Sequence, residues 1–266
     1  MPSWDPIVQE NVIQTNLATV QNRVLACMDP DAFDRLRPHL QLIALKRRAI
    51  LQEHNRPIEH VFFIERGVAS LFARTQRDGP VEVATIGRLG FVGVGVVLGA
   101  VRSPNRGLME VPGEALRIAS PLLRQVMADM PAVHQQLLHY VHALIVQNTQ
   151  TALCNARHEL QERLCRWLLL AADRLDESII PLTHDTLSVI LGVRRAGITT
   201  ALADLEQAGA IKKSRGAIEL LERAKLERKA CECYGIIASE YRRLTEAGIH
   251  RHVVARVSTA CDPAGS

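Results

Sequence analysis

The segment from Pro181 to Leu221 restricts the fold of this chain more than any other part of the sequence. Thr183 can cap a helix, because its hydroxyl can accept a free backbone N–H, and Gly192 suits the left-handed conformation that ends a helix. A second helix is predicted from Arg194, since apolar residues recur there at helical spacing until Gly209. Two short helices joined by a glycine turn predict a helix-turn-helix.

A short hairpin is predicted directly after the second helix. Residues 211–220 alternate apolar and polar side chains around Ser214-Arg215-Gly216, which is a pattern typical of a β-hairpin. Helix, turn, helix and hairpin in this order indicate a winged helix-turn-helix, which lays its second helix in the DNA major groove. An ordinary helical hairpin followed by a β-hairpin is the alternative.

The charges of this segment favour DNA as the partner. The chain as a whole carries a formal net charge of only +4, so bulk charge alone would not indicate nucleic acid. Within residues 192–216, however, the local net charge is +3, and the cations lie at the start of the second helix and on the hairpin. The five cations are Arg194, Arg195, Lys212, Lys213 and Arg215.

The sequence from about His39 to Ala119 changes to short strand-like runs separated by Gly, Pro, Asn or Asp. Such spacing predicts an antiparallel roll or sandwich, with Asp78-Gly79 as a tight turn. The glycine-rich stretch 87–99 only superficially resembles a phosphate loop, because no strand–helix–strand unit surrounds it. The predicted strands are residues 40–45, 61–64, 68–73, 81–86, 108–111 and 114–118.

A long helix is predicted after Pro131, and its apolar residues recur with a seven-residue rhythm. This rhythm is typical of a two-stranded coiled coil, in which one polar Asn can fix the register. We therefore expect a twofold dimer that reads pseudo-palindromic DNA. Burial of the helix against its own domain is the alternative. The expected dimer-helix residues are Leu137, Val141, Leu144, Ile145, Asn148 and Ala152.

The rest of the chain divides around these elements. A hinge is expected near Cys154–His158, and residues after the hairpin recur at helical spacing up to about Ala247, beyond which we expect a tail. The predicted parts are an N-terminal helical extension (1–36), a β-roll (37–130), a dimerisation helix (131–157), a winged helix-turn-helix (158–226), and a C-terminal helix and tail (227–266).

Several classes of protein are disfavoured by the sequence. There is no run of eighteen apolar residues and no basic-then-apolar leader, so we expect a cytoplasmic protein without a membrane partner. No nucleophile elbow, HExxH or P-loop is present, which argues against an enzyme. The six cysteines are scattered, which argues against a disulfide framework. Cys231 and Cys233 would point about 200° apart on one helix, so we expect no shared metal: Cys233 packs and Cys231 is a bystander.

The combined pattern resembles the cAMP receptor protein/FNR (Crp/Fnr) family over roughly residues 37–226. The matching stretches are GVASLF (67–72), VPGEALRI (111–118), ERLCRWLLL (162–170), LT-x5-ILGVRR (182–195) and LEQAGAIKKSRGAIEL (205–220), with CECY (231–234) after the wing. The resemblance implies an α+β chain: an N-terminal cyclic-nucleotide-binding-like β-roll, a long dimerisation helix and a C-terminal winged helix-turn-helix. It implies a homodimeric transcription factor whose roll senses a signal and repositions the DNA-binding domains, with RNA polymerase as a further partner.

The sequence departs from the family where an effector would bind. The stretch 90–95 holds no carboxylate for a ribose hydroxyl, so we expect no cAMP binding, and only Arg106 is a weak candidate for effector contact. Iron–sulfur members need an N-terminal cysteine cluster, where this chain has only Cys27. His54 and His60 are merely available as haem ligands. No cofactor is predicted, and the effector stays unknown.

The resemblance assigns one DNA contact, and Ala196 and Thr200 fall where the family has its other base-reading side chains. Arg195 matches an arginine with which the family reads bases, and Gly197 suggests close approach to the DNA backbone. A sensor acting through a protein partner instead of DNA is the competing function. The expected base contacts are Arg194, Arg195, Thr199 and Thr200, and the expected phosphate contacts are Thr183, Lys212, Lys213 and Arg215.

Overall fold

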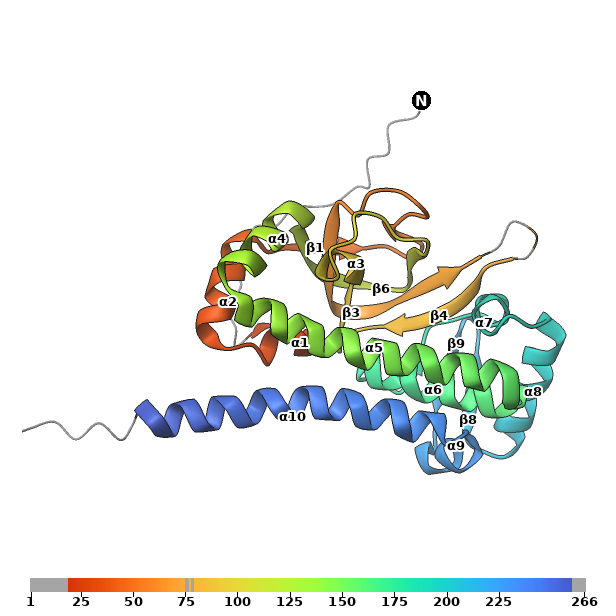
Figure 1. Cartoon of the computed structure of the whole chain (residues 1–266). Coiled ribbons are helices and arrows are strands. Elements are labelled where there is room, and N and C mark those ends of the chain that lie inside the picture. The colour runs from red at the N-terminus through yellow and green to blue at the C-terminus, as the bar shows by residue number, and fades with distance from the viewer. Residues whose placement is uncertain (1–18, 75–76, 78, 260–266) are drawn as a thin grey trace, which may run out of the picture.

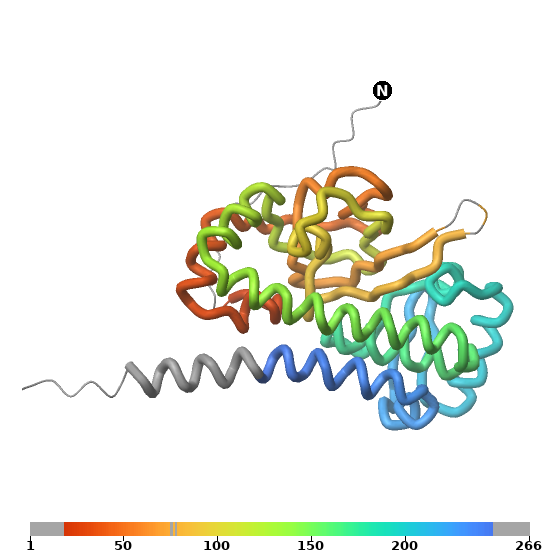
Figure 2. Tube along the Cα trace, in the orientation of Figure 1, coloured from red at the N-terminus to blue at the C-terminus, as the bar shows by residue number. Residues whose placement is uncertain are grey.

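The computed structural model describes residues 19–74, 77 and 79–259. A sheet-containing N-terminal body lies on one side of the long helix α5 (Pro131–Arg157), and a smaller C-terminal body lies near the end of that helix (Figure 1). The first part of helix α10 (Cys233–Thr259) runs back alongside α5 and contacts it (Figure 2). This mixed arrangement of helices and sheets confirms the predicted α+β fold.

The N-terminal body is built on two long antiparallel strands, β3 (His60–Ala73) and β6 (Arg106–Ala119). The strand order is β1-β6-β3-β4, with β2 paired to β6 and β5 paired to β3. All these pairs are antiparallel, in agreement with the predicted roll. The shorter strands are β1 (Gln41–Leu45), β2 (Ile50–Gln52), β4 (Val81–Ile86) and β5 (Phe91–Val92).

The two long strands correct the prediction of four shorter ones. The expected breaks at Gly67 and at Pro112-Gly113 are irregularities inside β3 and β6, where the register shifts around Arg66. Gly67 has a φ of +87°, and a Cβ on Gly113 would lie 2.0 Å from the carbonyl oxygen of Arg66. Glycine therefore bends the paired strands here without ending them. The turn predicted at Asp78-Gly79 lies partly outside the described residues.

The interior of the roll is filled by side chains. Phe63, Leu71, Phe91 and Val96 are all buried in one hydrophobic core. The ring of Phe91 lies 5.1 Å from that of Phe63 and 4.5 Å from that of Tyr140 on α5, measured between centroids. These contacts anchor α5 on the roll. Further helices are α1 (Arg23–Ala26), α2 (Pro30–Leu36), a 3-10 turn (Arg37–His39), α3 (Val94–Val97) and α4 (Ser120–Asp129).

One face of α5 is covered by its own chain, which corrects part of the predicted dimer seam. Leu137, Val141 and Leu144 are at most 4% exposed and belong to the core of the N-terminal body. With its amide oriented to satisfy its neighbours, Asn148 donates to the carbonyl of Val83 at 2.9 Å, so its partner lies in the same chain. The alternative of burial against the own domain therefore holds for this face.

The C-terminal body follows the predicted order of elements. The Thr183 hydroxyl accepts the backbone N–H of Thr186 at 3.2 Å and caps α7, and Gly192 ends α7 with a φ of +64°. Residues 215 and 216 form the turn between β8 and β9, and β9 also pairs with β7. The elements are α6 (Leu160–Leu175), β7 (Ile179–Ile180), α7 (His184–Leu191), α8 (Arg195–Gln207), β8 (Ile211–Ser214), β9 (Ala217–Leu220) and α9 (Arg223–Lys229).

The chain after the wing forms two helices separated by Ala230–Glu232. The prediction of a tail beyond Ala247 is wrong as far as Thr259, because α10 continues to that residue. Three buried α10 residues join the core of the N-terminal body: Ile237, Tyr241 and Leu244. Helix α10 therefore connects the two bodies a second time.

A buried polar network joins the roll to α6. The Glu82 carboxylate accepts the indole N–H of Trp167 at 2.7 Å and the hydroxyls of Ser70 and Thr85. The Arg174 guanidinium donates to the carbonyl of Thr85 at 2.8 Å. Burial raises the pKa of Glu82 above its usual range, against these hydrogen bonds. The network fixes α6 on β4, since breaking any bond would leave a buried polar group without a partner.

Candidate functional site

Helix α8 presents its predicted DNA-reading side chains on one exposed surface. Arg195, Thr199 and Thr200 are exposed, while the opposite face of the helix, with Ile198 and Leu202, is buried. The threonine hydroxyls donate to backbone carbonyls four residues back, at 3.2 Å each. Their protons are therefore occupied, and what they offer a base edge is an acceptor lone pair and a methyl group.

Two arginines lie at the start of α8. Arg194 is the N-cap residue, and no side chain caps the free backbone N–H groups there. The Arg195 Nε lies 3.0 Å from an Asp185 carboxylate oxygen, with both side chains about 70% exposed. An ion pair so exposed is worth only ~0–1 kcal/mol, so it can be exchanged for a stronger partner. A helix N-terminus with two mobile cations suits an anion or a guanine edge.

The cations of the wing are not equivalent. Lys212 and Arg215 are exposed, whereas the Lys213 Nζ pairs with a Glu206 carboxylate oxygen at 2.9 Å. Glu206 also accepts the backbone N–H of Lys213 at 2.8 Å, and this bond, with the side-chain pair, holds the pKa of Glu206 below its usual range. Lys213 is thus already neutralised within the chain. Thr183 has a structural role as the cap of α7.

Gly197 has a packing reason that the sequence does not reveal. A Cβ at this position would lie 3.1 Å from Leu160 Cδ2, which is on α6. The glycine thus lets α8 approach α6 closely inside the domain. Close approach to DNA is not needed to explain it.

A cleft of about 620 Å³ lies between the roll and α7. Arg106 lines it at the start of β6, and its Nε lies 3.2 Å from a Glu53 carboxylate oxygen. Arg106 therefore faces the space between the two bodies and is not part of the filled core of the roll. Other charged lining residues are Arg48, Arg74, Glu110 and Asp185.

Comparisons with known proteins agree with the DNA-binding function that the exposed cations of α8 and the wing suggest. A family model described as "Crp-like helix-turn-helix domain" matches residues 162–229, from within α6 to the end of α9. The whole fold is similar to a Crp/Fnr-family regulator from Eubacterium rectale, at 15% identity and a TM-score of 0.60, covering 77% of this chain and 96% of that one. Residues 162–229 thus match a Crp-like helix-turn-helix domain, and the chain shares the fold of the Crp/Fnr-family regulator.

Two further solved structures have a similar fold. The c-di-GMP-responsive global regulator CLP of Xanthomonas campestris is 16% identical, with a TM-score of 0.59 over 72% of this chain and 99% of its own. FixK2 of Bradyrhizobium japonicum is 13% identical, with a TM-score of 0.58 over 72% and 98%. A comparison with curated proteins gives no match.

The family match therefore supports the helix-turn-helix that the sequence predicts, within residues 162–229. In the part of the chain that the structure describes, no helix is long and apolar enough to cross a membrane.

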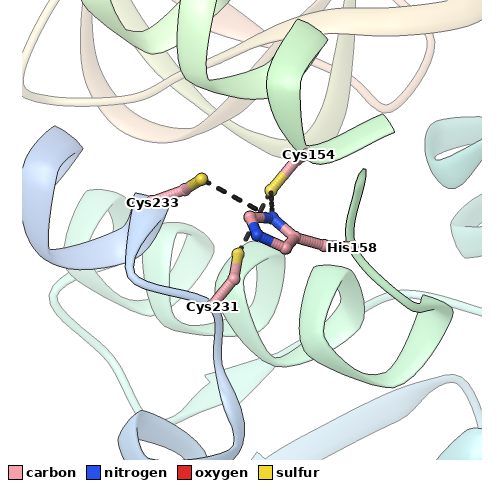
Figure 3. A group of neighbouring side chains, drawn as sticks. All are labelled: Cys154, His158, Cys231 and Cys233. Atoms are coloured by element: carbon pink, nitrogen blue, oxygen red, sulfur yellow. Dashed lines mark hydrogen bonds between the residues drawn. The ribbon is translucent and has the colours of Figure 1, made fainter. Parts of the chain in front are cut away.

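Near the end of α5 and the start of α10, the structure brings together three cysteines and a histidine (Figure 3). We call Cys154, His158, Cys231 and Cys233 the Cys₃His cluster. Cys154 lies in the last turn of α5 and His158 is its C-cap residue, whereas Cys231 precedes α10 and Cys233 begins it. The three sulfur atoms and one histidine nitrogen all lie within 4.8 Å of one another.

The cluster overturns the prediction that Cys231 and Cys233 cannot face one point. That prediction placed both on one helix, but the backbone at Cys231 is not helical, so the two side chains can converge. Cys231 is no bystander, because its Sγ lies 3.1 Å from that of Cys154. The sequence offers one signal for this site: Cys154 and His158 are four residues apart, which places them on one helix face.

The thiols of Cys154 and Cys231 share a hydrogen bond that pulls their pKa values apart. It lowers the pKa of Cys154 and raises that of Cys231, so Cys154 is the thiolate end of the pair. Burial raises the pKa of Cys233. The nearby positive charge of Arg166 favours the thiolate form of all three cysteines.

Proposed function

We propose that this regulator binds a pseudo-palindromic DNA site as a homodimer, with α8 of each subunit in a major groove. The exposed face of α8 carries the proposal, because its cations and acceptor groups make only exposed, exchangeable contacts inside the chain. Arg195 would contact a guanine, with Arg194, Thr199 and Thr200 beside it. Lys212 and Arg215 would contact phosphates and fix the register of the protein on the duplex.

The second copy would contact the outer face of α5. Leu138 and Ile145 are 38% and 55% exposed, and Ala152 is exposed one heptad further on. Their seven-residue spacing is that of a coiled-coil seam, while the opposite face of α5 is buried in its own chain. An apolar stripe along an otherwise anchored helix fits the same stripe of a twofold-related copy. Ile145 and Ala152 of the predicted seam thus keep their proposed role.

The roll would sense a signal and pass it to the DNA-binding domain through α5 and α6. The buried bonds between Glu82 and Trp167, and between Arg174 and Thr85, link the roll to α6. They would transmit a shift of β4 directly to the DNA-binding domain. We propose that the signal is not cAMP, since residues 90–95 lack the carboxylate, and that RNA polymerase is a downstream partner. Arg106, in the cleft, stays the candidate for effector contact.

Selection of bound duplexes from a randomised library tests the reading of DNA. A palindrome with half-sites about one helical turn apart is expected. Ile145→Glu should yield a monomer in sedimentation that binds this palindrome weakly, whereas Leu122→Glu, at another exposed apolar residue, should remain dimeric. A dimeric Ile145→Glu protein would contradict the proposed seam.

The competing function is a sensor that acts through a protein partner. The exposed cations at α8 and on the wing favour DNA, since they have the positions of a duplex footprint. Failure to select any sequence, together with binding that does not weaken as salt rises, would favour the protein partner instead.

A further inference from the structure

We propose that the Cys₃His cluster is a binding site for one zinc ion. The cluster supplies four ligand atoms of the types that zinc prefers, and four is the coordination number of structural zinc sites. Cys154, Cys231 and Cys233 are buried and form a small cluster of their own, separate from the two large hydrophobic cores. Cysteines that served only as small apolar side chains would be expected to merge with those cores.

The spacing of the ligand atoms fits a single ion. Zn–S bonds of ~2.3 Å and a Zn–N bond of ~2.05 Å in a tetrahedron place sulfurs ~3.8 Å apart and sulfur and nitrogen ~3.6 Å apart. The observed separations are 3.1 Å between the Cys154 and Cys231 sulfurs, and 3.3 Å and 3.7 Å from His158 Nδ1 to the sulfurs of Cys154 and Cys233. These three separations differ from the tetrahedral values by less than 1 Å, and all four ligand atoms lie within 4.8 Å of one another. A disulfide would bring two sulfurs to ~2.05 Å.

The charges around the cluster call for an anion at its centre. Arg166 is 4% exposed, Arg163 is half-buried, and the Nε of each has no hydrogen-bond partner among the described residues. No ion pair within 4.0 Å involves either arginine in the described part of the chain, and the buried Glu82 carboxylate is a more distant charge for Arg166. Three thiolates with Zn²⁺ carry a net charge of −1, whereas three thiols carry none. The zinc-bound state would therefore place a lasting counter-charge beside the buried Arg166 and the half-buried Arg163.

The position of the site gives the ion a structural task. Cys154 and His158 lie where the chain enters the DNA-binding domain, and Cys231 and Cys233 lie where it leaves. One ion would fasten the entry to the exit, and would fix the winged domain and α10 to the end of α5. Binding would release the thiol protons and would stabilise the folded chain over the unfolded one.

Metal content of the full-length protein, purified under reducing conditions, tests the proposal. We expect about one zinc per chain by inductively coupled plasma mass spectrometry. Metal-stripped protein titrated with Co²⁺ should show a thiolate-to-cobalt charge-transfer band and the strong visible bands of a tetrahedral site, reaching their maximum at one equivalent. No zinc uptake, an octahedral cobalt spectrum, iron in place of zinc, or a disulfide between Cys154 and Cys231 would overturn the proposal.

Variants separate the cluster from other cysteines. Cys231→Ala and His158→Asn should each lower zinc affinity by at least tenfold, whereas Cys27→Ala and Cys165→Ala, at buried cysteines outside the cluster, should keep one zinc per chain. Circular dichroism checks that each variant is folded. If Cys231→Ala does not fold, the zinc affinity of His158→Asn and the cobalt spectrum of the wild type still decide whether the cluster binds the ion. Equal loss of zinc in Cys27→Ala would contradict the assignment. The test does not involve DNA, so it stands apart from the proposed DNA site.

Discussion

Replacing Lys212 on the wing should change the salt dependence of DNA binding. Removing the neighbouring ion pair between Lys213 and Glu206 should leave the salt dependence unchanged. Lys212 is exposed and unpaired among the described residues, so its charge is available to a phosphate. Each phosphate neutralised contributes ~0.9 to the slope of log K against log salt. Lys212→Ala in both subunits of a dimer should therefore reduce the slope by ~1.8. Between 50 and 200 mM salt, the loss of affinity should then be ~12-fold smaller than in the wild type.

The matched control removes Lys213 together with its partner. Because the Lys213 Nζ already lies 2.9 Å from Glu206, the double variant Glu206→Gln/Lys213→Ala leaves the local net charge unchanged. Its slope should equal that of the wild type. Fluorescence anisotropy with the library-selected duplex at several salt concentrations measures both slopes. A decrease of ~1.8 in the double variant would refute the reasoning, since it would mean that Lys213 leaves Glu206 to bind a phosphate.

Three further outcomes are expected. Arg195→Ala should cost ~1–3 kcal/mol on the selected duplex and relax specificity at one base pair, and equal weakening on all duplexes would contradict this. Gly90→Ala should lower the free energy of unfolding in urea by ~1–3 kcal/mol, because the new Cβ would lie 2.2 Å from the ring of buried Tyr140; an unchanged midpoint would speak against it. Glu82 has a raised pKa through burial, so its stabilising effect is complete below the ordinary value of 4.5 and is lost as pH rises through the raised value. In the Glu82→Gln variant, the unfolding free energy should fall less steeply as pH rises. Parallel pH profiles for the variant and the wild type would exclude this role of Glu82.

Local signals in the sequence were sufficient for the helix-turn-helix. Thr183 and Gly192 act within a few residues of themselves, through a side-chain cap and a left-handed φ, and the structure confirms both ends of α7. The hairpin of the wing has the same local character. Such elements need no knowledge of the rest of the chain.

Features that depend on distant partners could not be predicted in this way. Gly67 and Gly113 read as strand breaks, because only the pairing of β3 with β6 shows that the ladder continues past them. The seven-residue apolar repeat of α5 marks two apolar faces of the helix. Which face is buried depends on how the roll and α10 pack against it. The break before Cys233 carries neither Pro nor Gly, so nothing local shows that Cys231 and Cys233 converge on Cys154 and His158.

Helix α10 has a consequence for the order in which the protein is made. Its residues Ile237, Tyr241 and Leu244 complete the core of the N-terminal body, and the Cys27 thiol lies 3.6 Å from the carbonyl oxygen of Thr245, 218 residues away. During synthesis the roll emerges from the ribosome before the winged domain, yet part of its apolar surface stays open until α10 has been translated. Domains usually fold as units in the order of their synthesis. Here the N-terminal body is translated before the winged domain, but its core is completed only by α10. A chain that stops after the wing would leave this core incomplete.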